Sequence, residues 1–167
     1  DCGGPDCAPC TTTGGPDTDC GMGTDDFVLC FGDACDVDVN GTACLDITAG
    51  NLNNITAFQA DVIFADSDLT FVSFTDAGEL SHPINANTSS GAPRLLFFQP
   101  DQSGNTVPDG TVIGTVCFTN LTVSPTIVSL ADLTARDNDG DAIAAIGSSG
   151  SVNGCMTTTP SCSDGMM

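Results

Sequence analysis

The stretch that decides the fold is residues 55–74, ITAFQADVIFADSDLTFVSF, in which two apolar runs flank a short acidic turn. In the first run every second side chain is apolar: Phe58, Ala60, Val62 and Phe64. An alternation with period two predicts a β-strand that buries one face in a core. Residues 69–74 predict a second strand. Residues 65–68 suit a turn, because aspartate side chains can hydrogen-bond to nearby backbone groups.

Short runs of the same kind fill most of the remaining chain. We predict further strands at residues 27–31, 34–39, 42–47, 94–99, 111–123, 126–133, 142–146 and 151–155. The Asn40-Gly41 dipeptide predicts a hairpin between residues 34–39 and 42–47. Residues 76–92 are polar and predict a loop, and no helical periodicity exceeds one turn. The sequence therefore predicts an all-β protein, an antiparallel β-sandwich of roughly nine strands.

The composition divides the chain into three parts. Residues 1–25 have almost no large apolar side chain and are dominated by Gly, Pro, Asp, Thr and Cys. Such a segment cannot build a core of its own, so we predict a Cys/Gly/Pro-rich N-terminal arm or cap. The sandwich is predicted to span residues 26–155, and residues 156–167 form a polar C-terminal tail.

Ten cysteines in 167 residues indicate an oxidising compartment and a set of disulfide bonds whose pairing the sequence leaves open. They are Cys2, Cys7, Cys10, Cys20, Cys30, Cys35, Cys44, Cys117, Cys155 and Cys162. The alternative is a zinc site at the C-x-x-C of residues 7–10, but a second C-x-x-C is missing and His82 is distant in sequence. The chain begins with Asp1 and contains no long apolar run, which predicts a mature extracellular or cell-surface protein without a membrane span.

The charge is strongly acidic. The chain has 22 acidic residues, two arginines, no lysine and one histidine, which gives a formal net charge of −20. A surface of this kind repels nucleic acids and anionic membranes, and it attracts divalent cations or basic partners. Adaptation to high salt is the alternative explanation.

The residues Asp-Asn-Asp-Gly-Asp at 137–141 are the best candidate for a chemical site. Oxygen ligands two residues apart, with a glycine for the sharp turn, can converge on a hard cation, so we predict Ca²⁺ at Asp137, Asp139 and Asp141. The alternative is an acidic turn without metal. A second acidic group, Asp33, Asp36, Asp38 and Asp46, either supplies cation ligands or lines the solvated face of the predicted hairpin.

Four N-x-S/T sequons predict sites of N-glycosylation at Asn40, Asn54, Asn87 and Asn120. No motif of a catalytic triad, a zinc protease or a P-loop is present, and the chain contains neither Trp nor Tyr for a sugar-stacking cleft. We therefore predict that the protein is not an enzyme.

Four segments resemble a cohesin-type domain over about residues 33–153. Residues 41–74 resemble its first half through Ile55, Phe58, Gln59, Asp61, Phe64, Asp66, Leu69, Phe71 and Ser73. Its second half is matched by RLLFFQPD, GTVIGTVCFTNL and SLADLTARDNDGDAIAA, at residues 94–101, 110–121 and 129–145. The resemblance implies a nine-stranded jelly-roll sandwich that binds other proteins and catalyses nothing.

The first functional hypothesis is a self-associating protomer of an extracellular or cell-surface filament. In this hypothesis the arm, or the strand at residues 27–31, adds to the open sheet edge of the next copy, and Ca²⁺ or disulfides lock the joint. The alternative is a cohesin-like adaptor that binds a separate protein module. A third hypothesis is a glycan-binding module.

Overall fold

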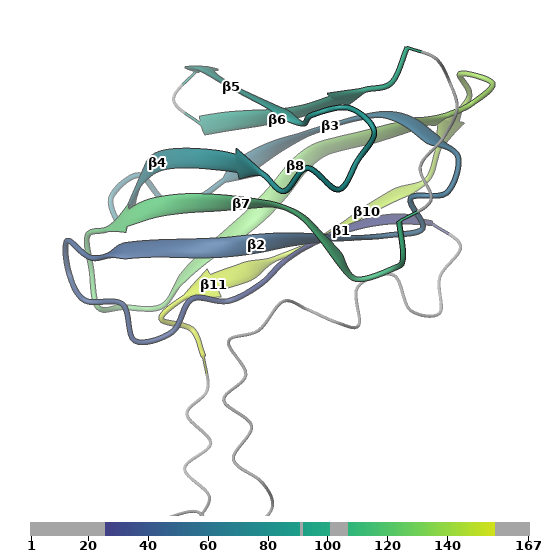
Figure 1. The fold of residues 1–167 in the computed structure, drawn as a ribbon. Coiled ribbons are helices and arrows are strands. Elements are labelled where there is room, and N and C mark those ends of the chain that lie inside the picture. Colours follow the sequence, from purple (N-terminus) through teal and green to yellow (C-terminus); the bar gives the residue numbers. More distant parts are fainter. Residues whose placement is uncertain (1–25, 91, 101–106, 156–167) are drawn as a thin grey trace, which may run out of the picture.

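The computed structural model describes residues 26–90, 92–100 and 107–155, which form two β-sheets packed face to face (Figure 1). The predicted arm at residues 1–25 and tail at residues 156–167 lie outside the described residues. No described residue is helical. Accordingly, the described part of the chain offers no helix long and apolar enough to cross a membrane. The prediction of an all-β sandwich is confirmed.

One sheet has the strand order β10-β1-β2-β7-β4. Its strands are β1 (Phe27–Phe31), β2 (Thr42–Gly50), β4 (Leu69–Asp76), β7 (Thr111–Asn120) and β10 (Ala145–Ser148). Neighbouring strands are antiparallel except β1 and β10, which run parallel.

The other sheet has the order β11-β8-β3-β6-β5, and the short β9 pairs with β8. Its strands are β3 (Ile55–Ile63), β5 (Asn85–Ser90), β6 (Ala92–Phe98), β8 (Thr126–Asp137), β9 (Ala142–Ile143) and β11 (Gly150–Val152). All of its pairings are antiparallel.

The core lies between the sheets, and the period-two alternation of β3 supplies part of it. Phe58, Ala60 and Val62 are at most 3% exposed, as predicted. The ring of Phe58 packs between Phe27 and Phe97, with centroid separations of 5.3 and 5.2 Å. Burying one such apolar side chain contributes about 1.5–3 kcal/mol, so β3 holds the two sheets together through its inward face.

The acidic turn at residues 65–68 carries the chain from one sheet to the other. The amides of Asp68 and Leu69 both donate to the carbonyl of Ala65, at 2.9 and 3.0 Å. The two strands on either side of this turn, β3 and β4, therefore lie in different sheets and do not pair with each other.

Two sequence predictions about local structure are wrong. The turn at Asn40-Gly41 forms, with Asn40 at φ 66°. Residues 34–39, however, do not pair with β2, which lies between β1 and β7. The polar residues expected to form a loop contain the edge strand β5, which pairs only with β6 among the described strands. Its sequence, NANTSS, has no apolar alternation by which it could be recognised.

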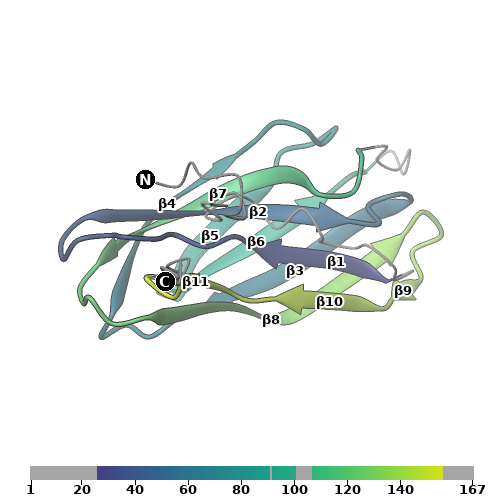
Figure 2. The ribbon, with the colours of Figure 1, turned by 90° about the horizontal axis from the view of Figure 1, so that it is seen from below.

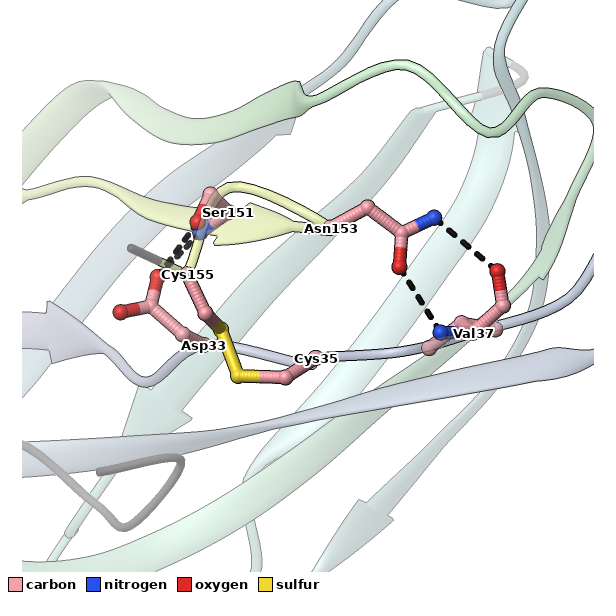
Figure 3. The surroundings of a disulfide bond; sticks show 6 residues. All are labelled: Asp33, Cys35, Val37, Ser151, Asn153 and Cys155. Carbon is pink, nitrogen blue, oxygen red and sulfur yellow. Dashed lines mark hydrogen bonds between the residues drawn. A yellow bond between two sulfur atoms is a disulfide. The ribbon is translucent and has the colours of Figure 1, made fainter. Parts of the chain in front are cut away.

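Disulfide bonds tie distant parts of the sandwich together. Cys44 and Cys117 are directly opposite residues of β2 and β7, with a Cα–Cα distance of 4.1 Å. Cys35 and Cys155 join the two ends of the described chain across a sequence separation of 120 residues (Figure 3). Cys30 is disulfide-bonded as well. The predicted disulfides are thus present at all five described cysteines, and Cys2, Cys7, Cys10, Cys20 and Cys162 lie outside the described residues.

Candidate protein-binding face

The outer face of the sheet formed by β8, β3 and β6 gathers exposed apolar and cationic side chains. Alternation turns every second residue of these strands away from the core. The strand register then aligns them in rows across the face, because directly opposite residues point the same way. We refer to this surface as the β8–β3–β6 face.

The first row consists of Arg136 on β8, Ala57 on β3 and Phe98 on β6. Phe98 is 67% exposed, an unusual position for a large aromatic side chain. Ala57 is small, so a shallow hollow opens between the ring and the guanidinium group. Gln59, Leu96 and Thr134, which form the second row, line it as well.

The third row contains an ion pair. Arg94 on β6 lies opposite Asp61 on β3, and its Nε and Nη2 atoms donate to Oδ1 and Oδ2 at 2.5 and 2.6 Å. These hydrogen bonds are the main reason why the pKa of the Asp61 carboxyl lies below its ordinary value; desolvation by burial opposes the effect. The same contacts raise the pKa of Arg94.

The face holds both arginine side chains that a protein of net charge −20 possesses, Arg94 and Arg136. One hydrogen bond of Arg136 goes to the carbonyl of Gly140, at 2.7 Å. Two further exposed aliphatic residues, Ile63 on β3 and Ile127 on β8, also lie on these strands. Ile63 continues the outward parity of β3, whereas in β8 a bulge changes the outward parity between Thr134 and Ile127. This face is apolar, with Arg94 paired to Asp61 and a second positive charge on Arg136, and it differs in this from the acidic protein around it.

This face was not predicted from the sequence, because the run of residues 94–99 shows no clear alternation. Leu95 and Phe97 are buried, whereas Arg94, Leu96 and Phe98 point outward. Apolar residues on both parities hid the alternation. The available signal was the placement of the only two arginines, of which Arg94 falls on a predicted strand and Arg136 lies three residues after one.

The loop at residues 137–141, predicted to bind calcium, forms the turn between β8 and β9. The Oδ1 atom of Asp137 accepts from the amides of Asp139 and Asp141, at 3.0 and 2.9 Å. Gly140 adopts φ 82° at the tip. In the described part of the chain, no three His, Cys, Asp or Glu side chains lie close enough to hold a metal ion. Calcium binding here stays a prediction.

The second acidic group is dispersed by the fold. Asp33 accepts hydrogen bonds from Ser151, and Asp46 accepts one from Thr115 at 2.7 Å. Asp36 and Asp38 are both exposed, and no three of the four carboxylates lie close enough together to hold a metal ion. The carboxylates of Asp33 and Asp46 therefore serve local structure.

The four sequon asparagines occupy different environments. Asn40, Asn54 and Asn87 are exposed. Asn120 is fully buried, and its side-chain nitrogen donates to the carbonyls of Val37 and Asp38. An attached glycan does not fit the folded environment of Asn120, whose side chain holds the loop before β2.

Comparisons with known proteins identify the fold. No protein-family profile matches the chain, and no curated protein matches it in sequence. Solved structures do match. The cohesin CaCohA2 of Clostridium acetobutylicum, in complex with a variant of CaDoc0917, is 15% identical with a TM-score of 0.66, covering 75% of this chain and 97% of that one.

Two further cohesin structures agree. The sixth cohesin of scaffoldin B from Acetivibrio cellulolyticus, in complex with a Cel5 dockerin mutant, is 17% identical with a TM-score of 0.65, covering 77% of this chain and 98% of that one. A non-cellulosomal cohesin from the archaeon Archaeoglobus fulgidus is 10% identical with a TM-score of 0.61, covering 76% and 91%. The resemblance seen in the sequence is thereby confirmed at the level of the fold: this chain has a cohesin-like fold.

Proposed function

We propose that the domain is a non-enzymatic adaptor that binds a separate protein module through the β8–β3–β6 face. The observation that carries this proposal is the row Arg136, Ala57 and Phe98, in which an exposed ring and a guanidinium group flank a hollow. Aromatic residues and arginine are enriched among the residues that dominate the energy of protein interfaces.

The comparisons support this function over self-association. Two of the similar structures are cohesins bound to a separate dockerin module. The charge distribution also favours one orientation of the partner. An apolar side chain of the partner fits the hollow, and a carboxylate beside it meets Arg136. The acidic remainder of the domain repels such a partner elsewhere.

The experiment is a binding comparison on the immobilised full chain. Proteins from the native extracellular fraction are passed over wild type, Phe98→Ala and Val123→Ala. Val123 is the matched control, because it is 73% exposed but lies in the segment between β7 and β8, outside the face. We expect a protein retained by wild type and by Val123→Ala to bind Phe98→Ala at least about tenfold more weakly. Equal affinity of wild type and Phe98→Ala excludes this face.

The filament hypothesis loses one of the two joints that it offered, the strand at residues 27–31; the other, the arm at residues 1–25, lies outside the described residues. All five residues of β1, Phe27–Phe31, are buried, and the strand lies between β2 and β10 of its own chain. It is therefore not available to complete the sheet of another copy. We propose the adaptor in place of the filament.

An extracellular location belongs to the same proposal, because disulfide bonds persist in oxidising compartments. Calcium at Asp137, Asp139 and Asp141 and glycans at the exposed sequons are further parts of it. Calorimetric titration with Ca²⁺, comparing wild type with Asp139→Ala, tests the metal site. The mass of the native protein before and after treatment with a glycosidase tests the glycans.

A further inference from the structure

We propose that the domain also transmits tension between its two ends along a covalent path that includes β1 and leaves the rest of the sandwich unloaded. This function is separate from binding at the β8–β3–β6 face and does not depend on it. It follows from how the first and last described segments lie beside each other and where the Cys35–Cys155 disulfide joins them.

The two segments run parallel along the sandwich (Figure 2). Phe27 is paired with Ala145, Cys30 with Ser148 and Ala34 with Val152, so the register stays constant along the whole contact. The disulfide between Cys35 and Cys155 follows directly after the last of these pairs (Figure 3). Residue 26 and Cys155 therefore lie at opposite ends of the contact.

Tension applied between these two points has a short route. It enters before β1, follows residues 27–35, crosses the disulfide and leaves at Cys155. A β-strand rises about 3.3 Å per residue, close to the limit of about 3.3–3.6 Å for a fully extended chain. The part of the loaded segment that forms β1, Phe27–Phe31, is therefore almost fully extended in the folded state, and pulling gains hardly any length from it.

Everything else in the sandwich lies off this route. The strands β2 to β11, from Thr42 to Val152, belong to the loop that the disulfide closes. The load enters and leaves this loop at the two cysteines that the disulfide joins. Because the disulfide carries the load between them, the residues inside the loop are not extended. The fold, including the β8–β3–β6 face, is thus shielded from the load.

Hydrogen bonds on both sides of the disulfide hold the two segments in place. The Oδ1 atom of Asp33 accepts from the amide and the hydroxyl of Ser151, both at 2.7 Å. The side chain of Asn153 accepts from the amide of Val37 at 2.8 Å and donates to its carbonyl at 3.0 Å. These contacts position the two sulfur atoms. If the disulfide were removed, the load would act on these hydrogen bonds and break them.

The nested disulfide Cys44–Cys117 makes the proposal quantitative. It holds 73 of the 120 residues between Cys35 and Cys155, so 47 residues become extensible when only the outer bond is removed. At about 3.3–3.6 Å per residue the contour length then grows by about 160 Å. When both bonds are removed, all 120 residues of the separation become extensible, and the contour length grows by about 410 Å.

The experiment is single-molecule stretching of the full chain, oxidised, with handles at its two ends. We expect wild type to show no step from residues 36–154 before the handles detach. The double variant Cys35→Ala/Cys155→Ala is expected to show one new step of about 160 Å, counted at about 3.3–3.6 Å per residue. Wild type measured in a disulfide reductant is expected to reach the longer extension, and it gives the same test if the variant fails to fold.

The matched control is Cys44→Ala/Cys117→Ala, which removes a disulfide that lies off the route. It is expected to stretch as wild type does. A step of 47 residues or more in oxidised wild type overturns the proposal. An unchanged trace for Cys35→Ala/Cys155→Ala overturns it too, because the load then passes elsewhere.

Discussion

Arg94 and Asp61 face each other across β6 and β3 and form a two-pronged ion pair in the middle of the β8–β3–β6 face. The two hydrogen bonds hold both side chains in a fixed position relative to each other. Its ends are partly open to water, with side-chain exposures of 44% and 22%, so salt screens the attraction.

The first prediction concerns pH. Since the pKa of Asp61 is lowered in the folded state, the pair stabilises the fold above the ordinary aspartate pKa of about 3.9 and loses this contribution as the pH falls below that value. We expect the difference in unfolding free energy between wild type and Arg94→Gln to be constant from pH 5 to 7 and to shrink towards pH 3. Urea titrations across this range measure it. Asp66→Asn, at an exposed turn position, is the control, and a difference independent of pH contradicts the prediction.

The second prediction concerns Asn120, which is fully buried at the end of β7. Its amide holds the carbonyls of Val37 and Asp38, at 2.9 and 3.3 Å. Substitution by alanine removes these bonds and is expected to lower the unfolding free energy by about 1–3 kcal/mol. Urea unfolding of Asn120→Ala against the exposed Asn53→Ala tests it; equal losses in the two variants speak against a role of burial.

The third prediction concerns Gly150, where the chain passes from β10 in one sheet to β11 in the other, beside the end of β1. A Cβ atom there would overlap the carbonyl oxygen of Gly32 and would lie 2.7 Å from the Cβ of Phe31. Gly150→Ala must push these segments apart, with an expected loss of about 1–3 kcal/mol in stability.

Thermal or urea unfolding measures the loss at Gly150, and Gly78→Ala is the control. Gly78 has φ +75° but nothing within 4 Å of its Cβ position. Its substitution therefore costs only the backbone strain of a left-handed residue, about 1–2 kcal/mol. If β1 can shift freely, Gly150→Ala is no less stable than wild type.

The fourth prediction concerns the disulfide between β2 and β7. It closes a loop across 73 residues and restricts the unfolded chain. Cys44→Ala/Cys117→Ala is expected to lose about 2–4 kcal/mol of unfolding free energy. The loss is measured by urea unfolding without reductant. Comparison with wild type in reductant separates this bond from the others, and unchanged stability shows that sheet pairing alone fixes the register.

The sequence predicted those elements whose information is local. The alternation of Phe58, Ala60 and Val62 identified β3 and its buried face, since strand periodicity needs only neighbouring residues. The turn after it was predicted from its aspartates. The sheet to which each strand belongs was not, because pairing depends on residues far away in the chain.

The two errors about β1 and residues 34–39 share this cause. The apolar run Phe27–Phe31 looked available to another copy because its parallel partner, β10, begins only at Ala145. The segment after it looked like half of a hairpin, yet Asn153 holds Val37 in place. The disulfide between Cys35 and Cys155 likewise joins residues that are far apart in the sequence. The number of cysteines alone does not reveal which of them pair.

The placement of the two arginines has a consequence for resistance to proteolysis. Trypsin-like proteases cleave after Lys or Arg, and the chain offers them only the bonds after Arg94 and Arg136. Arg94 is paired with Asp61 on one side and Asn87 on the other; Arg136 is paired with Ala57 and Ala142. Either peptide bond can enter a protease active site only after its strand has separated from the sheet. The folded domain therefore resists trypsin-like proteases until β6 or β8 unfolds locally.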